Sequence, residues 1–274
     1  MLDAVLQSNS ASTDRRRPRS ARSSAVVYPL FNEFTVVHPT NSNLSEPALP
    51  GTPERRWAQH LFRRSDWSPA DGPLLVVAPH PDDEVMGAGG LIHTWAGMGR
   101  SVTVLSVTDG EAELPPRQNL DRIRREELKE ALRKLCATHV SVVRLGIPDG
   151  RVAEFQNKLR SAILSLIEPA MTMIAPYERD GHPDHDVVGS VCCEIARSRG
   201  IPLARYPIWT WQRADPTEFR EVSWGKFPLD SEARRAKTHA LQCFMSRLRP
   251  DRREPMVPRH LLNYFERSYE AFLL

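Results

Sequence analysis

Short apolar runs alternate with longer segments of helical spacing along the middle of this chain, and this alternation limits the folds it can adopt. The apolar runs lie at 74–78, 102–107, 140–145 and 171–175, with a candidate fifth run at 204–208. The segments between them, at 85–98, 119–135, 154–168 and 185–198, place apolar residues three and four apart. Strands and helices at these spacings form βαβ units. The chain therefore predicts an α/β fold: a Rossmann-like, mostly parallel sheet flanked by helices, in a single domain over residues 55–274.

The first 54 residues lack that periodicity and are rich in Ser, Pro, Asn and Arg. This composition predicts a flexible N-terminal extension, residues 1–54, although an Arg- and Ser-rich start with few acids also resembles an organelle transit peptide. Much of the net charge of +3 is concentrated in the run Arg-Arg-Arg-Pro-Arg-Ser-Ala-Arg at 15–22. A nucleic-acid interaction would depend on this run alone, so we expect no nucleic-acid partner.

The four cysteines form no Cys-x-x-Cys pair, which is typical of buried thiols in a reducing compartment. The first 25 residues lack the apolar core of a secretory signal, and no stretch approaches the roughly 18 apolar residues of a membrane helix. We therefore expect a cytoplasmic protein without a membrane span. The sequence leaves open whether the chain forms homo-oligomers.

Two histidine-containing segments follow the first and the fourth predicted strands. The first reads His80-Pro81-Asp82-Asp83-Glu84 and comes directly after the run at 74–78. The second reads His182-Pro183-Asp184-His185 and follows the run at 171–175 after a short loop. The carboxyl ends of parallel strands lie along one edge of a sheet, where such folds place their functional sites. The two segments are therefore expected to form one site.

The residue types in these segments predict a bound metal ion. Asp82, Asp83 and Glu84 gather like charge at a helix start; capping explains one or two acids there, but not the preceding histidine. Two imidazoles with one carboxylate are typical of catalytic zinc, which keeps a fourth position open for water. The same set also suits non-haem Fe²⁺, so iron remains an alternative. A hydrolase also needs a general base near the metal, and Asp82 adjoins Asp83.

The segment Val76–Glu84 resembles the Ala-His-Pro-Asp-Asp-Glu signature of the LmbE-like, or PIG-L, family of zinc-dependent N-deacetylases. Residues 180–185, Asp-Gly-His-Pro-Asp-His, resemble the second signature of this family. Weaker likeness continues through 124–135, 148–150, 206–211 and 236–246, so the resemblance spans residues 73–250. The chain departs from the common pattern at Pro79 and at Cys136. It also has Arg247 at a position where a glutamine is usual.

The resemblance implies a role for each polar residue of the two segments. Three side chains would bind one zinc ion: His80, Asp83 and His185. Asp82 would take a proton from the attacking water and later deliver it to the leaving amine. His182 would stabilise the oxyanion, and Asp184 would orient one of the histidines and support its charge. The implied reaction removes an N-acetyl group from a small acetamido-sugar conjugate of the N-acetylglucosamine type.

Several alternatives stay open. The same zinc site would also serve a hydrolase of another amide or of a thiol-conjugate, and the fold without catalysis would serve as a binding protein. Arg124 and Asp149 are candidates for binding substrate hydroxyl or phosphate groups; their structural alternatives are a surface helix charge and a turn-forming Asp-Gly. Lys237 and His239 are expected on a solvated helix face.

Overall fold

The computed structural model describes residues 51–112, 117–136, 138–248 and 259–274. The chain divides into Met1–Glu46, which lies outside these residues, and Pro47–Leu274. The predicted flexible extension, residues 1–54, falls outside the described residues except for its last four, and its basic run at 15–22 lies outside them entirely. In the described part of the chain, no helix combines the length and the apolar character needed to cross a membrane.

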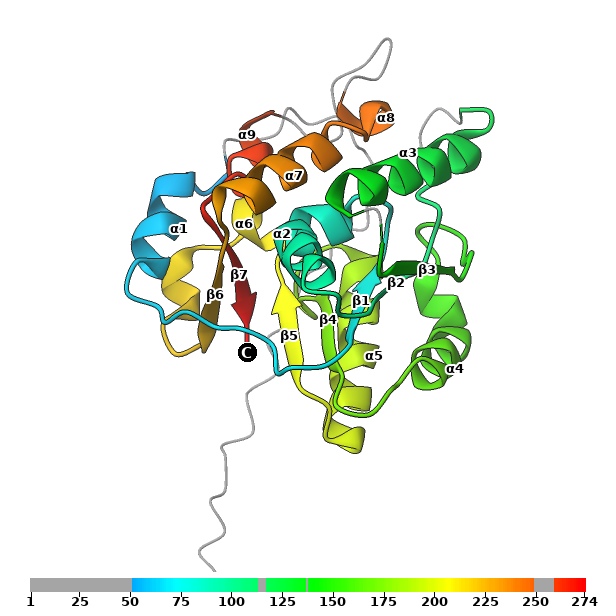
Figure 1. The fold of residues 1–274 in the computed structure, drawn as a ribbon, viewed down its shortest axis with the longest axis horizontal. Helices are drawn as coiled ribbons and strands as arrows, with labels where there is room; N and C mark the ends of the chain where they lie inside the picture. Colours follow the sequence, from blue (N-terminus) through cyan, green and yellow to red (C-terminus); the bar gives the residue numbers. More distant parts are fainter. Residues whose placement is uncertain (1–50, 113–116, 137, 249–258) are drawn as a thin grey trace, which may run out of the picture. The chain divides into compact units, whose positions relative to one another are not determined.

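A seven-stranded sheet forms the centre of the fold, in the order β3-β2-β1-β4-β5-β7-β6 (Figure 1). The first five strands in the chain are parallel, whereas β7 runs antiparallel to both β5 and β6. The strands are β1 Leu74–Ala78, β2 Val102–Ser106, β3 Val140–Arg144, β4 Thr172–Pro176, β5 Leu203–Tyr206, β6 Trp224–Pro228 and β7 Tyr269–Leu273. The predicted mostly parallel α/β fold is confirmed, and the β6–β7 pair is an addition to it.

Alternate side chains of β1 enter two different cores, one on each face of the sheet. Leu74 and Val76 pack into the core that contains residues of α2 Asp83–Gly97, α3 Leu120–Leu135 and α7 Ser231–Leu241. Leu75 and Val77 pack into the core that contains residues of α4 Gln156–Ser165 and α5 Pro183–Arg199. A strand covered by helices on both faces must be apolar throughout, which explains the continuous run at 74–78.

Shorter elements complete the described residues. They are α1 Glu54–Leu61, the 3₁₀ turns Val152–Phe155 and Pro216–Phe219, α6 Thr210–Arg213, α8 Met245–Leu248 and α9 Arg259–Leu262. Helix α1 buries Trp57 and Leu61, and the Trp57 ring lies edge-on to Trp211 with centroids 4.9 Å apart. Helix α1 is thereby joined to the same core as α2.

The strand order reverses at β1, which has β2 on one side and β4 on the other. In open α/β sheets, ligands bind outside the carboxyl ends of the strands at such a reversal, because the following loops diverge there. The segment starting at His80 follows β1, and the segment starting at His182 follows β4. The fold thus places both histidine segments at its expected binding position.

Candidate metal centre

The first turn of α2 presents the acids of the first segment. β1 ends at Ala78, and α2 begins at Asp83 with Asp82 in the capping position. Asp82 has φ 125° and ψ −30°, and a backbone conformation of this sparsely populated kind costs about 1–3 kcal/mol and persists only where the surrounding structure imposes it. Its carbonyl accepts hydrogen bonds from Val85 N at 3.1 Å and Met86 N at 2.8 Å. The following helix therefore holds this strained residue in place.

Three buried side chains from the two segments converge on one point. His80 Nδ1 and His185 Nε2 lie 3.3 Å apart, and each lies 3.2 Å from Asp83 Oδ2. His80, Asp83 and His185 are 4%, 2% and 0% exposed. The structure thus brings together the three side chains predicted as metal ligands, one from the loop after β1 and one each from α2 and α5.

The spacing of these three atoms fits a tetrahedral metal ion. Zinc binds histidine nitrogen and carboxylate oxygen at about 2.0–2.2 Å, so its tetrahedral ligand atoms lie roughly 3.3–3.5 Å apart. The observed separations of 3.2–3.3 Å agree with that value. Three protein ligands also leave one position for water or substrate, as in catalytic zinc sites. Two nitrogens and one oxygen suit Fe²⁺ as well.

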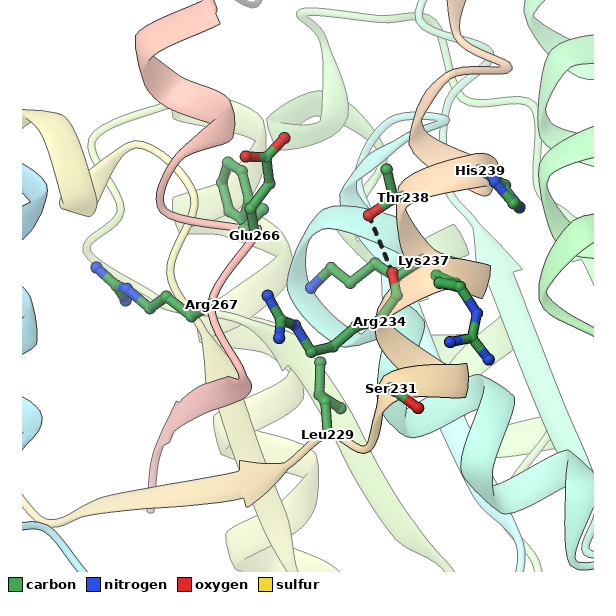
Figure 2. A pocket seen from close by; sticks show the side chains of 10 residues that line it. Leu229, Ser231, Arg234, Lys237, Thr238, His239, Glu266 and Arg267 are labelled. Atoms are coloured by element: carbon green, nitrogen blue, oxygen red, sulfur yellow. Dashed lines mark hydrogen bonds between the residues drawn. The ribbon is translucent and has the colours of Figure 1, made fainter.

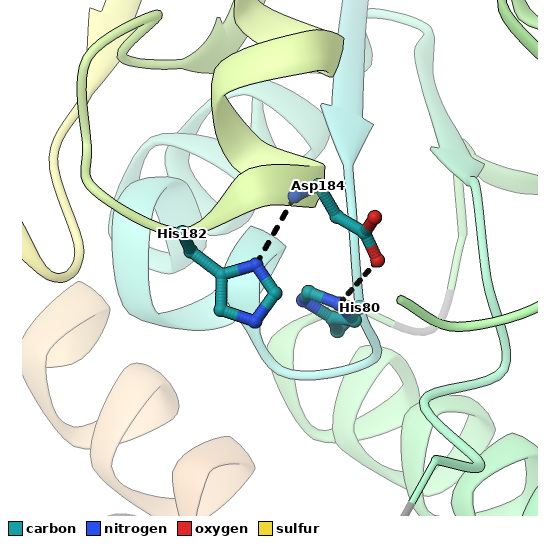
Figure 3. A group of neighbouring side chains, drawn as sticks. All are labelled: His80, His182 and Asp184. Atoms are coloured by element: carbon teal, nitrogen blue, oxygen red, sulfur yellow. Dashed lines mark hydrogen bonds and ion pairs between the residues drawn. The ribbon is translucent and has the colours of Figure 1, made fainter. Parts of the chain in front are cut away.

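A second group of candidate ligands shares His80. In this group His80, His182 and Asp184 bring ligand atoms within 4.8 Å of one another (Figure 3). However, His182 Nδ1 accepts a hydrogen bond from Asp184 N at 3.3 Å, and Asp184 Oδ2 accepts one from Gly150 N at 2.7 Å. The ligand atoms of the group containing Asp83 lie only 3.2–3.3 Å apart, so that more compact group is the better metal site.

Each histidine of the better site has a carboxylate on its other ring nitrogen. His80 Nε2 lies 3.0 Å from Asp149 Oδ1 and 3.3 Å from Asp184 Oδ2. His185 Nδ1 lies 2.9 Å from Asp180 Oδ2. A carboxylate in this position accepts a hydrogen bond from the ring N–H, fixes the tautomer and leaves the opposite nitrogen free to bind a metal. Both imidazoles are thus oriented as metal ligands.

Asp180 was not assigned a role by the sequence interpretation. Its buried carboxylate accepts hydrogen bonds from Ile208 N at 3.0 Å, Trp209 N at 3.0 Å, Thr210 N at 2.9 Å and the Thr210 hydroxyl at 2.7 Å. These bonds draw the chain after β5 into the turn that starts α6, which is why the predicted fifth strand ends early. The signal available in the sequence was the acid at the start of the segment 180–185.

Asp82 lies beside the metal ligands with one unengaged oxygen. The residue is 3% exposed, its Oδ2 pairs with Arg247 Nε at 2.8 Å, and its Oδ1 has no hydrogen-bond partner among the described residues. Burial raises the pKa of Asp82 to about 6, although Arg247 opposes the shift. The family departure at position 247 therefore lies directly against the predicted general base.

Two buried arginines approach this part of the site. Arg124 from α3 is 1% exposed and Arg247 from α8 is 8% exposed, so the surface-charge alternative for Arg124 is wrong. Both guanidinium groups lie against Gly110: a side-chain carbon there would be 2.9 Å from Arg124 Nη1 and 3.2 Å from Arg247 Nη2. Glu127 anchors α8 by accepting hydrogen bonds from Ser246 N at 2.7 Å and Ser246 Oγ at 2.6 Å.

His182 presents a hydrogen-bond donor next to the ligand atoms. Its ring centroid lies 4.9 Å from those of His80 and His185. Because Nδ1 accepts from Asp184 N, the neutral ring carries its proton on Nε2. Burial, together with the charges of His80 and His185, lowers the pKa of His182 to about 3. The side chain is therefore neutral at physiological pH.

The ligand histidines behave differently from His182. Burial lowers the pKa of His185, but Asp83 and Asp180 outweigh it and raise the value to about 9. In the same way Asp149, Asp184 and Asp83 raise the pKa of His80 well above its ordinary value. Without a metal, both imidazoles are thus protonated at neutral pH.

A separate cavity lies away from this centre. It has a volume of about 480 Å³ and is lined by residues of α7 and by residues 265–267 (Figure 2). The predicted site residues, all of which are described, do not line it. This cavity is therefore separate from the two histidine segments at the strand ends.

Comparison with known families agrees with the strand-end site. Residues 75–196, somewhat under half of the chain, match the family model described as PIG-L: GlcNAc-PI de-N-acetylase. This segment contains all six residues of the two histidine segments to which roles were assigned, and the predicted resemblance to the LmbE-like, or PIG-L, family is confirmed.

Individual relatives share parts of the chain. The probable N-acetyl-alpha-D-glucosaminyl L-malate deacetylase 2 of Bacillus cereus is 30% identical over 135 residues, which are 42% of this chain and 57% of the relative. The diacetylchitobiose deacetylase of Thermococcus kodakarensis is 29% identical over 143 residues, 47% of this chain and 51% of the relative. This chain thus spans little more than half the length of these two curated relatives.

A solved structure extends the comparison of folds. The N,N'-diacetylchitobiose deacetylase of Pyrococcus horikoshii matches with a TM-score of 0.52 and 23% identity, over 73% of this chain and 82% of that one. At this identity the match establishes a shared fold.

Proposed function

Because residues 75–196 form a PIG-L, or LmbE-like, domain, we propose that this protein is a zinc-dependent hydrolase that removes an N-acetyl group from an acetamido-sugar conjugate. The observation that carries the proposal is the near-equilateral triangle of His80 Nδ1, Asp83 Oδ2 and His185 Nε2. The deacetylase names of the two curated relatives support the reaction class.

His80, Asp83 and His185 would hold the zinc ion, which when bound would polarise the acyl carbonyl and make water more acidic. The carboxylates on the outer ring nitrogens keep both imidazoles in the tautomer that binds metal. Burial of all three ligands excludes competing water from the centre.

Asp82 performs the proton transfers in this mechanism. Its Oδ1 has no partner among the described residues, so it is able to accept a proton from the attacking water. Arg247 Nε forms an ion pair with Oδ2 at 2.8 Å and places a positive charge beside the carboxylate. The same Oδ1 then delivers the proton to the leaving amine nitrogen. A positioned general base and acid of this kind contributes about 10²–10⁴-fold to the rate.

His182 stabilises the oxyanion that develops on the acyl oxygen. Its proton lies on Nε2 because Nδ1 accepts from Asp184 N, and the hydrogen bond fixes the ring plane. A neutral, preoriented donor needs no reorganisation when the negative charge develops, and one such donor contributes about 10²–10³-fold to turnover.

The substrate class rests on the relatives, whose names specify N-acetyl-glucosaminyl malate and diacetylchitobiose. We assign Arg124 and Asp149 to the part of the site that contacts sugar hydroxyl or phosphate groups. For Asp149 this role is additional to its contact with His80 Nε2 at 3.0 Å. Another amide or a thiol-conjugate is the alternative substrate for the same residues, and we place the reaction in the cytoplasm.

An amine-release screen with parallel metal analysis tests the proposal. The full chain is expected to bind about one zinc per molecule and to release a primary amine from at least one N-acetylglucosamine conjugate among lipid-, thiol-, nucleotide- and antibiotic-linked forms. The Asp82→Ala protein is the matched control, because it keeps all three ligands. A purified chain that binds neither zinc nor iron would refute the proposal.

A further inference from the structure

Helix α2 is broken one turn after it begins, and an ion pair occupies the break. Ala88 has φ −143° and ψ 17°, which is not helical. In a continuous helix the N–H of Gly90 would donate to the carbonyl of Met86. Here Gly90 N donates to Glu270 Oε1 at 2.7 Å, and Lys237 Nζ donates to Met86 O at 2.8 Å. The side chains of Lys237 and Glu270 thus replace one missing backbone hydrogen bond.

The two charges also bind each other. Lys237 Nζ lies 2.7 Å from Glu270 Oε1, and their side chains are 3% and 2% exposed. Glu270 Oε2 accepts a further hydrogen bond from Leu91 N at 2.9 Å. The expectation that Lys237 lies on a solvated helix face is therefore wrong. A buried ion pair is costly unless its remaining donors and acceptors are satisfied, and the broken helix supplies those partners.

Close packing accounts for the position of the break. A side-chain carbon on Gly87 would lie 2.4 Å from the ring of Tyr206, so only glycine allows this approach. The Tyr206 hydroxyl donates to Val77 O at 2.8 Å and ties the ring to β1. The ring of Tyr206, from β5, therefore packs against α2 at Gly87, next to the non-helical residue Ala88.

The first turn of α2 contains the chemistry of the site. Asp82 caps it, and Asp83, whose Oδ2 lies 3.2 Å from each ligand histidine nitrogen, begins it. Lys237 comes from α7 and Glu270 from β7, so elements more than 140 residues later in the chain connect to this turn. No atom of the pair is among those that form the metal triangle.

We propose that Lys237 and Glu270 are positioning residues for the metal centre: by replacing the missing hydrogen bond of α2, they fix the turn that presents Asp82 and Asp83. This inference rests on the proposed zinc-dependent function. It predicts that disturbing the pair weakens zinc binding and lowers kcat, although neither side chain touches the metal or the substrate.

Glu270→Gln and Lys237→Met are the test variants, because both keep the shape of the side chain and remove its charge. We expect each to bind zinc about 10-fold or more weakly in competition with a chelator, as when partners behind metal ligands are lost. At saturating zinc, kcat falls while KM stays close to wild type. Leu159→Ala in α4 is the control, because it removes core packing on the opposite face of the sheet.

Chemical rescue gives a second, independent readout. Lys237 lines the cavity of about 480 Å³, which offers a small amine access to the vacated position (Figure 2). We expect n-propylammonium to restore part of the zinc affinity of Lys237→Ala. n-Propylammonium is not expected to restore the zinc affinity of Glu270→Gln, because that variant lacks the anion. Tetramethylammonium has no N–H donor and should restore the zinc affinity of neither variant.

The outcomes separate the two proposals. If the folded Glu270→Gln and Lys237→Met proteins bind zinc within twofold of wild type, the positioning role is wrong while the proposed function stands. Zinc affinity that falls equally in Leu159→Ala also overturns the positioning role, since the effect then follows general stability. A wild-type chain that binds no zinc overturns both proposals. Weaker zinc binding in the two variants, unchanged binding in Leu159→Ala and rescue by n-propylammonium establish the role.

Discussion

Replacing Asp180 with asparagine should disable His185 as a metal ligand, because it changes the contact at Nδ1, the ring nitrogen opposite the one that would bind the metal. Asp180 Oδ1 accepts hydrogen bonds from Ile208 N and from both donors of Thr210, so the amide oxygen of the new side chain would occupy that position. The amide NH₂ would then face His185 Nδ1, now 2.9 Å from a carboxylate oxygen. Two donors cannot face each other at this distance, so when the ring loses one proton to bind a metal, the remaining proton would stay on Nε2, the atom that faces Asp83.

A proton on Nε2 removes the lone pair that would bind the metal. Loss of the partner behind a metal-binding histidine lowers metal affinity by about 10–100-fold, or roughly 1.4–2.8 kcal/mol. The same NH₂ also faces Trp209 N, which donates to Asp180 Oδ2 at 3.0 Å in the wild type. Loss of this hydrogen bond should lower the free energy of unfolding of the metal-free protein by about 1–3 kcal/mol.

The assay is zinc competition with a chelator, combined with thermal unfolding of the metal-free protein. Asp186→Asn is the matched control: this acid lies in the same helix as His185 and accepts from Gly181 N at 3.0 Å. Unchanged zinc affinity in Asp180→Asn, measured on folded protein, would refute the tautomer argument.

Substitutions at three further positions separate the roles within the site. Asp82→Ala should keep zinc affinity but lose about 10²–10⁴-fold in kcat, since it removes the proton acceptor; full activity would contradict the assignment. His182→Ala should lose about 10²–10³-fold in kcat with zinc content unchanged, and loss of zinc would instead indicate a ligand. Arg247→Gln removes the charge that lowers the pKa of Asp82, so the acid limb of the kcat/KM profile should shift to higher pH, whereas Arg247→Lys should leave it in place.

The parallel part of the fold was predictable because its central strands, β1 and β4, are buried on both faces. Runs such as 74–78 have no polar interruption, and each is followed by a segment of helical period. The β6–β7 pair was not predicted. Its strand β7 has Glu270 within Tyr269–Leu273, and a charged residue at a buried position hides the apolar pattern. That charge is compatible with burial because Lys237, which lies elsewhere in the chain, neutralises it.

The grouping of the three proposed metal ligands was predictable because they lie in two short segments that the strand order brings together. Their partners were harder to find, since each contact joins residues distant in sequence. Arg247 meets Asp82 only because Glu127 of α3 holds Ser246 of α8. No spacing rule connects positions so far apart, and a single sequence offers no signal for such a pair.

The charges around the ligands lead to a final prediction. Asp83 and Asp180 raise the pKa of His185 to about 9, and the pKa of His80 is also well above its ordinary value. Between pH 7 and 8 the metal-free protein therefore holds a proton on each ligand nitrogen, in the place of the metal. A metal needs both nitrogens deprotonated, so binding should release protons.

At pH 7.5 we expect roughly two protons to leave for each zinc bound, one from each histidine. The number should fall as the pH rises through 9, because His185 then titrates before the metal arrives. Titration calorimetry in buffers of different ionisation enthalpy measures this number directly. His182→Ala is the control: its imidazole has a pKa of about 3 and is neutral in both states, so the release should not change. Zinc binding without proton release would show that the triangle of His80, Asp83 and His185 is not the metal site.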